Sequence, residues 1–252
     1  MKRSIWTVVA IALLAVACGK AGDTGESGAK APDPAARKAA LTTLESAKKA
    51  LDAKREELAS LKDQLANGAA VQSQIDAAKA EVDKMADALG TNLVAYINAG
   101  APEVGAPMPA DEQEAIRMKS AEDMIIAKEF IDQSGDYRKA IDIYNASLQI
   151  DPNNADLKAA LADAQVRRYM TSDRFAQIQK GMTEQQVVNL IGRPYYRNVR
   201  DYPEKKVTAW FYPKNEDGEA AGVFFNSEKK NVYSTNFNAV KRSSEPQAEA
   251  PH

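Results

Sequence analysis

Cys18 is the residue whose chemistry stands out most clearly, because it is the only cysteine in a chain of 252 residues. Its thiol is a nucleophile that can be acylated or oxidised, but without a second cysteine it cannot form a disulfide within the chain. His252 is the only histidine and occupies the last position. We therefore expect no histidine base, no proton shuttle and no histidine-based metal site.

Other signs of catalysis are also absent from the sequence. We find no Gly-rich phosphate loop, no Gly-x-Ser-x-Gly elbow and no cluster of metal ligands, and the acidic residues follow helix-surface spacing. The formal net charge of -2 argues against a nucleic-acid partner, which normally requires a basic excess. We predict a protein without catalytic residues, metal or cofactor. A hydrolase with two carboxylates brought together by the fold is the remaining enzymatic alternative.

The segment before Cys18 suggests how its thiol is used. Lys2 and Arg3 precede an apolar run over residues 5–17, which ends in Ala15-Val16-Ala17. This run is shorter than the roughly 20 residues of a membrane span. It resembles a bacterial lipobox, which implies that residues 1–17 are a signal peptide and that Cys18 carries the lipid. Gly19, rather than an aspartate, follows Cys18, and this resembles the pattern of enterobacterial lipoproteins sent to the outer membrane, where the protein would face the periplasm. The alternative is an ordinary secretory signal with an incidental cysteine.

Residues 18–34 are rich in small and polar residues and predict a flexible tether. Residues 35–98 predict two helices that form a coiled-coil hairpin, interrupted at Asn67-Gly68 where a left-handed residue ends the first helix. An extended trimeric coil is the alternative, and either form allows a homo-oligomer. The first seam has spacings of three and four: Leu44, Ala47, Leu51, Lys54, Leu58, Leu61 and Leu65; the second continues from Val71 through Ile75, Ala78, Val82, Met85 and Leu89.

Residues 99–110, with three prolines, predict a linker, and residues 111–170 predict further helices. Within them one unit, 121–154, resembles the tetratricopeptide repeat, and the helix over 155–170 is expected to cap it. Ala140 is small where two helices cross, and Pro152 ends the helix. The repeat-motif residues are Gly135, Tyr137, Ala140, Tyr144 and Pro152. Peptide capture in the repeat groove and a purely structural packing role are both open.

Residues 175–240 change from helical periodicity to aromatic residues and short strands. Thr183 predicts a helix N-cap with Gln186 completing a capping box, and Gly192 with Pro194 predicts the end of that helix. Strands are expected over 207–212, 222–226 and 232–237, and 195–199 is a candidate further edge. With the helices before it, this pattern predicts an α+β chain whose sheet has three antiparallel strands. Residues 241–252 are expected to be a disordered tail.

This last region resembles the BamE family, also named SmpA or OmlA. The residues that carry the resemblance include the family-motif positions Gly181, Met182, Thr183, Val187, Gly192, Pro194, Trp210 and Tyr212. The family implies a helical pair packed on a three-stranded sheet, and a supporting role in barrel-protein insertion through binding of the assembly machinery and anionic lipid. Residues 175–242 contain eleven basic and seven acidic side chains, which we interpret as a solvated surface rather than as a lipid site.

Together these features predict a non-enzymatic envelope lipoprotein that acts as an interaction platform in outer-membrane assembly or maintenance. Its expected partners are envelope proteins, including the assembly machinery, and the membrane itself through the lipid. The alternative is a binding or inhibitory module for a soluble periplasmic or extracellular protein. This alternative exists because the small helix-and-sheet fold also resembles secreted β-lactamase inhibitor proteins.

Overall fold

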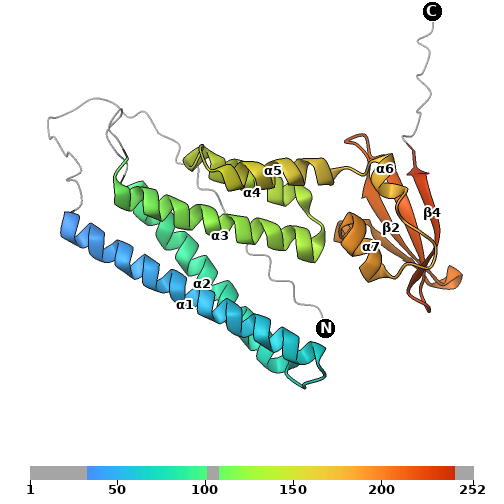
Figure 1. Ribbon diagram of the computed structural model, residues 1–252, viewed down its shortest axis with the longest axis horizontal. Coiled ribbons are helices and arrows are strands. Elements are labelled where there is room, and N and C mark those ends of the chain that lie inside the picture. Colours follow the sequence, from blue (N-terminus) through green and yellow to red (C-terminus); the bar gives the residue numbers. More distant parts are fainter. Residues whose placement is uncertain (1–32, 101–107, 242–252) are drawn as a thin grey trace, which may run out of the picture. The chain divides into compact units, whose positions relative to one another are not determined.

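The computed structural model describes residues 33–100 and 108–241 (Figure 1). The predictions for Cys18, for the signal peptide, for most of the tether and for the C-terminal tail lie outside these residues. In the described part of the chain, no helix is long and apolar enough to cross a membrane. The α+β class is confirmed, because helices fill the first part of the chain and an antiparallel sheet follows them.

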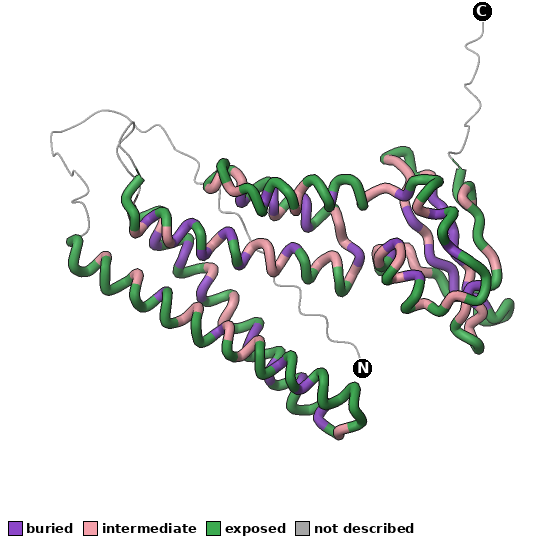
Figure 2. Tube along the Cα trace, in the orientation of Figure 1, coloured by how far each residue is buried: buried purple, intermediate pink, exposed green. Residues whose placement is uncertain are grey.

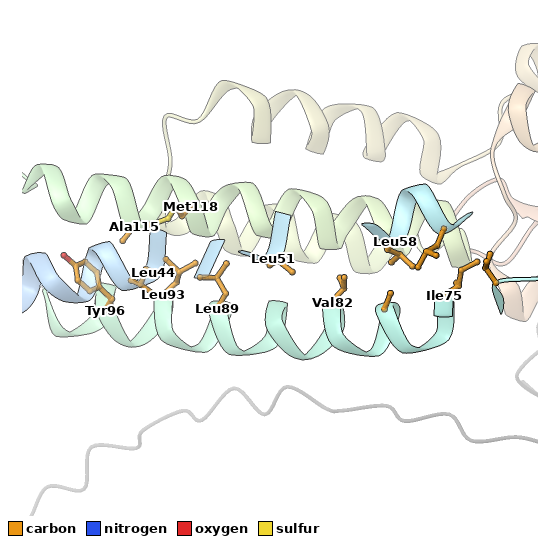
Figure 3. Packing of buried hydrophobic residues seen from close by; sticks show 13 residues of the cluster. Leu44, Leu51, Leu58, Ile75, Val82, Leu89, Leu93, Tyr96, Ala115 and Met118 are labelled. Atoms are coloured by element: carbon orange, nitrogen blue, oxygen red, sulfur yellow. The ribbon is translucent and has the colours of Figure 1, made fainter. Parts of the chain in front are cut away.

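Helices α1 (Pro34–Ala66) and α2 (Gln72–Ala99) pack against each other in antiparallel directions (Figure 1). Asp33 caps the start of α1, and Asn67 ends it, followed by Gly68 at φ +90°. The turn therefore lies where the Asn-Gly signal placed it. Buried side chains recur every seven residues along both helices (Figure 3): Leu44, Leu51 and Leu58 on α1, and Ile75, Val82, Leu89 and Tyr96 on α2.

Helix α3 (Ala110–Ser134) belongs to two cores. Its first half contributes Ala115 and Met118 to the core of α1 and α2 (Figure 3). Its second half contributes Ala127 to a core with α4 (Tyr137–Ile150) and α5 (Ala155–Arg168). One continuous helix therefore packs in both cores. Most of the linker predicted at 99–110 lies outside the described residues.

Two groups of partly buried ion pairs fasten α1 to α3. Arg55 donates two hydrogen bonds to the Glu122 carboxylate, at 3.0 and 2.7 Å, and Lys48 lies 3.3 Å from the same carboxylate. Near the other end, the Nε of Arg37 donates to Asp111 at 2.5 Å. The side chain of Glu122 is only 3% exposed, so its charge depends on these cations.

The C-terminal region has two short helices, α6 (Ser172–Phe175) and α7 (Glu184–Ile191), and two 3-10 turns, η1 (Tyr196–Asn198) and η2 (Pro203–Lys205). Its strands, in sheet order, are β1 (Val199–Tyr202), β2 (Val207–Pro213), β3 (Ala220–Asn226) and β4 (Asn231–Val240). All neighbours are antiparallel. The sheet has one strand more than the three predicted, because β1 pairs with β2 and starts where the candidate edge ended.

The two faces of this sheet differ. One face packs against α7, with Trp210, Val223 and Phe225 buried beside Val187 and Ile191. The rings of Trp210 and Phe225 lie 4.5 Å apart. The opposite face has the half-buried Phe211 and Phe224, whose rings meet edge-on at 6.2 Å. Figure 2 shows the buried residues along the strands and on the inward sides of the helices.

Candidate functional site

The repeat-motif residues act in packing and in the turn between helices. Ala140 and Tyr144 are buried in the core of α3, α4 and α5, whereas Pro152 is exposed in the turn before α5. Gly135 ends α3 with φ +64°, a left-handed conformation that favours glycine, and Tyr137 begins α4. Tyr137 packs against the same core as Ala140 and Tyr144, whereas Gly135 and Pro152 lie in the turns before α4 and α5.

The first BamE-type motif residues join α7 to the sheet. The amide of Gly181 donates to the carbonyl of Val232 at 2.8 Å, and Val232 donates back to Met182 at 2.8 Å. Thr183 caps α7 in the capping box expected from the sequence. Val187 and Trp210 are buried in the core between α7 and the sheet. These residues shape the fold and do not converge on a shared cleft.

The remaining motif residues meet one another across the repeat and the sheet region. A Cβ on Gly135 would lie 2.5 Å from the backbone of Arg193 and Pro194, so only glycine permits this approach. Gly192 has φ +89°, and a Cβ there would lie 2.7 Å from the hydroxyl of Tyr137. Gly135 and Gly192 therefore each fit against a motif residue of the other region.

A second group of contacts continues this junction after α5. The amide of Met170 donates to the carbonyl of Pro213 at 2.7 Å. Arg168 and Tyr169 both reach Glu216 in the turn after β2, at 3.4 and 3.3 Å. The hydroxyl of Tyr212 donates to the carbonyl of Gly192 at 3.0 Å, which ties the end of α7 to β2. Hydrogen bonds and an ion pair thus fix both the loop after α7 and the turn after β2.

These contacts frame a cleft of about 1000 Å³ that receives residues from both motif regions. Its walls are the start of α4, the end of α5, the loop after α7, the strands β1 and β2, and the turn from β2 into β3. Seven of its residues are arginine or lysine and four are aspartate or glutamate. Its aromatic residues are Tyr137, Tyr169, Tyr195, Tyr202, Phe211 and Tyr212. It is a polar, net basic cleft with aromatic walls.

Most of the cations in the cleft are not neutralised by carboxylates. The Nε of Arg193 donates to the carbonyl of Asp132 at 3.1 Å, and the Nε of Arg197 donates to the hydroxyl of Tyr196 at 2.8 Å. Arg200 donates to the carbonyls of Arg197 and Val199. Among the described residues, Arg138 and Lys139 make no side-chain ion pair, and both are exposed. The cleft therefore holds available positive charge.

The tyrosines of the cleft remain neutral hydrogen-bonding groups. Burial raises the pKa of the Tyr137, Tyr169 and Tyr195 phenols above their usual range. Each hydroxyl therefore keeps its proton at neutral pH and can donate or accept a hydrogen bond. No group of three or more histidine, cysteine, aspartate or glutamate side chains in the described residues has the arrangement needed to hold a metal ion.

The motifs are evident in the sequence, whereas the cleft is not. Arg193, Arg197 and Arg200 belong to the basic excess of residues 175–242, for which the sequence favours a solvated surface. The usable signal was their spacing of four and three just after the glycine that ends α7. That spacing alone does not show that the start of α4 faces them.

Comparison with protein families agrees with the resemblance to the tetratricopeptide repeat and with the resemblance to the BamE family. Residues 133–168 match the tetratricopeptide repeat model, which covers α4 and α5 rather than the expected unit at 121–154. Residues 168–245 match the model of the outer membrane protein assembly factor BamE domain. Neither the curated proteins nor the solved structures contain a match to this chain. The chain therefore carries a tetratricopeptide repeat directly followed by a BamE domain.

Proposed function

We propose that this chain is a non-enzymatic lipoprotein of the outer membrane, facing the periplasm, and that it acts as an interaction platform in the assembly or maintenance of that membrane. The observation that carries the proposal is the BamE domain, whose family description names an outer membrane protein assembly factor. Repeats of the tetratricopeptide type and BamE domains are both protein-interaction modules, which supports binding as the activity.

The junction between the two domains supports the same proposal. Gly135 and Gly192 fit closely against residues of the opposite domain. These contacts fix the backbone on both sides of the cleft. A preorganised cleft loses little conformational entropy when a partner binds, and this favours binding. In this proposal the cleft is the partner site, and α1 and α2 form a spacer between it and the anchor.

Crosslinking in intact cells tests the platform role. A photoreactive residue at Arg197, inside the cleft, is compared with the same residue at Val166, which is 68% exposed on α5 and outside the cleft. We expect position 197, and not position 166, to crosslink to proteins of outer-membrane assembly. Crosslinks from position 197 that contain only soluble periplasmic proteins would support the alternative of a binding or inhibitory module.

A separate experiment tests the anchor. We expect Cys18→Ser to abolish incorporation of a labelled fatty acid and to move the protein from the membrane fraction to the soluble fraction. A thioether-linked lipid with several acyl chains holds a protein firmly, at about 0.8 kcal/mol per buried methylene. Fatty-acid labelling that persists in the Cys18→Ser variant would contradict the proposed lipid site.

A further inference from the structure

We infer that the cleft between the repeat and the BamE domain binds an acidic segment of a partner protein in an extended conformation. This inference rests on the proposed function and specifies the chemistry of its partner. The cleft lies between α4, the end of α5 and the sheet, and is defined by the residues that surround its volume of about 1000 Å³.

The cleft leaves much of its positive charge available to a ligand. Arg193, Arg197 and Arg200 make their hydrogen bonds to neutral acceptors and form no ion pair with a carboxylate of the described residues. Arg138 and Lys139 add two exposed cations from the start of α4. Only Arg167 and Arg168, which pair with Asp163 and Glu216, are neutralised. A ligand with carboxylates is therefore favoured.

The guanidinium groups after α7 are already positioned by hydrogen bonds within the protein. A guanidinium has five N–H donors, and each of the three arginines after α7 uses one or two of them within the protein. The remaining donors can hold a carboxylate through two parallel hydrogen bonds. Arg197 also lies over the ring of Tyr196, 5.5 Å from its centre, which limits its motion further.

The size and the aromatic content of the cleft also suit an extended peptide. Clefts that enclose a drug-sized ligand measure roughly 300–1,000 Å³, so this one accepts several residues of an extended chain. Tyr195, Tyr202 and Phe211 provide apolar surface next to the cations. Arginine and tyrosine are the residues most often enriched at the energetic centres of protein interfaces.

The same cleft is less suited to the headgroups of an anionic membrane. Asp136, Asp142, Glu216 and Glu219 are also part of its walls. These carboxylates would repel the phosphate groups of an anionic membrane surface. A peptide presents backbone N–H groups that can pair with such carboxylates while its acidic side chains reach the arginines. The mixed charge of the cleft therefore favours an acidic peptide over a lipid.

Binding of a defined probe tests this inference. The full chain is titrated into a fluorescein-labelled peptide with two copies of Asp-Leu-Glu-Leu, and into its amide counterpart with two copies of Asn-Leu-Gln-Leu. The variant R138Q/R197Q/R200Q removes three cations of the cleft and leaves Arg193, which contacts α3, in place. The matched control K158Q/K180Q/K229Q removes three exposed lysines outside it.

We expect saturable binding of the acidic peptide, at least tenfold weaker binding of the amide peptide, and at least a tenfold loss in R138Q/R197Q/R200Q but not in the lysine control. Equal binding of both peptides, an unchanged triple variant, or no saturation by 1 mM would overturn the inference. Loss of binding to phosphatidylglycerol vesicles in the triple variant, without peptide binding, would overturn it in favour of a lipid.

The failure of this inference is distinguishable from the failure of the proposed function. Crosslinks from position 197 to assembly proteins, together with charge-independent peptide binding, would leave the platform role intact and remove only the acidic ligand. Charge-dependent peptide binding without any envelope crosslink from position 197 would support the cleft chemistry and remove the platform role.

Discussion

The arginines of α1 and those of the cleft use the same side chain in opposite ways. Arg37 and Arg55 are 13% and 20% exposed, and both are paired with carboxylates of α3. Arg197 and Arg200 are exposed and held by neutral acceptors. Arg37 and Arg55 therefore join helices through ion pairs, whereas Arg197 and Arg200 keep their charge available for a ligand.

The surroundings of Arg37 show how completely the first kind is enclosed. Its guanidinium lies 4.2 Å from the centre of the Tyr96 ring, and a Cβ on Gly100 would lie 2.1 Å from it. Tyr96 donates to the same Asp111 carboxylate that Arg37 contacts, at 2.7 Å. An arginine that is paired with a carboxylate and one that is free to bind a ligand cannot be told apart in the sequence. An arginine therefore indicates a binding function only after its hydrogen-bond partners are known.

The largest loss of stability should follow from removal of the Arg55–Glu122 ion pair between α1 and α3. Arg55→Ala leaves Glu122 buried with only Lys48 beside it, and removing one partner of a buried pair costs about 3 kcal/mol. We expect the free energy of unfolding, measured by urea denaturation, to fall by that amount. Arg197→Ala is the control and should change it by less than about 0.5 kcal/mol. Equal losses in the two variants would remove the distinction between the regions.

The junction that frames the cleft should respond next most strongly. Gly135→Ala places a methyl group in contact with the backbone of Arg193 and Pro194 and forces a non-glycine residue to φ +64°. The left-handed conformation costs about 1 kcal/mol and the crowding about 1–2 kcal/mol more. We expect a loss of about 2–3 kcal/mol in thermal or urea unfolding.

The matched control for this variant is Gly218→Ala. Gly218 has φ +84°, but a Cβ there meets no atom within 4 Å. Only the conformational cost of about 1 kcal/mol should remain. If Gly218→Ala is as destabilising as Gly135→Ala, the contact between Gly135 and the BamE domain does not matter energetically.

A smaller effect on stability should appear at alkaline pH, where the phenol of Tyr96 beside Arg37 and Asp111 loses its proton. Burial, followed by the hydrogen bond to Asp111, raises the pKa of Tyr96 to about 12. Because the folded pKa lies above the unfolded value of about 10, the stabilisation by the protonated phenol is complete below pH 10. It is lost as the pH rises to about 12. Tyr96→Phe should unfold about 1 kcal/mol more easily at pH 7, from loss of the hydrogen bond.

The measurement is the difference in unfolding free energy between the wild type and Tyr96→Phe over this pH range. Taking the difference cancels the titration of the lysines. We expect the difference to shrink between pH 10 and 12. A difference that stays constant over that interval would show that the Tyr96 phenol does not stabilise the junction of α1, α2 and α3.

The smallest effect on stability is expected in the cleft itself. R138Q/R197Q/R200Q removes cations that have no carboxylate partner in the described structure, so each substitution should change the free energy of unfolding by less than about 0.5 kcal/mol. Urea denaturation measures this directly. A loss approaching that of Arg55→Ala would mean that the cleft arginines are structural.

The ends of helices were the features best predicted from the sequence. Asn67 and Gly68 end α1, and Thr183 with Gln186 forms the capping box of α7. These signals are local, since a cap depends on residues three or four positions apart. The α+β class followed from the change of periodicity before the strands. Leu65 was wrongly assigned to the buried seam, because it lies at the end of α1 and is 39% exposed.

The features missed depend on contacts between distant segments. The four residues of β1 are largely exposed and lack an apolar alternation, so only their pairing with β2 defines the strand. Glu122 resembles a helix-surface residue in the sequence, yet it is buried against Arg55. The cleft exists because Gly135 fits against Pro194, and neither residue alone predicts the other.

The central claim is that the arginines of the cleft are available in the isolated protein and covered by a partner in the envelope. Modification by phenylglyoxal, read by mass spectrometry, measures this for each arginine in purified protein and in intact envelopes. We expect Arg138, Arg197 and Arg200 to react rapidly when purified and slowly in envelopes, with Arg37 and Arg55 slow in both. Equal reactivity of the cleft arginines in the two preparations would contradict the account.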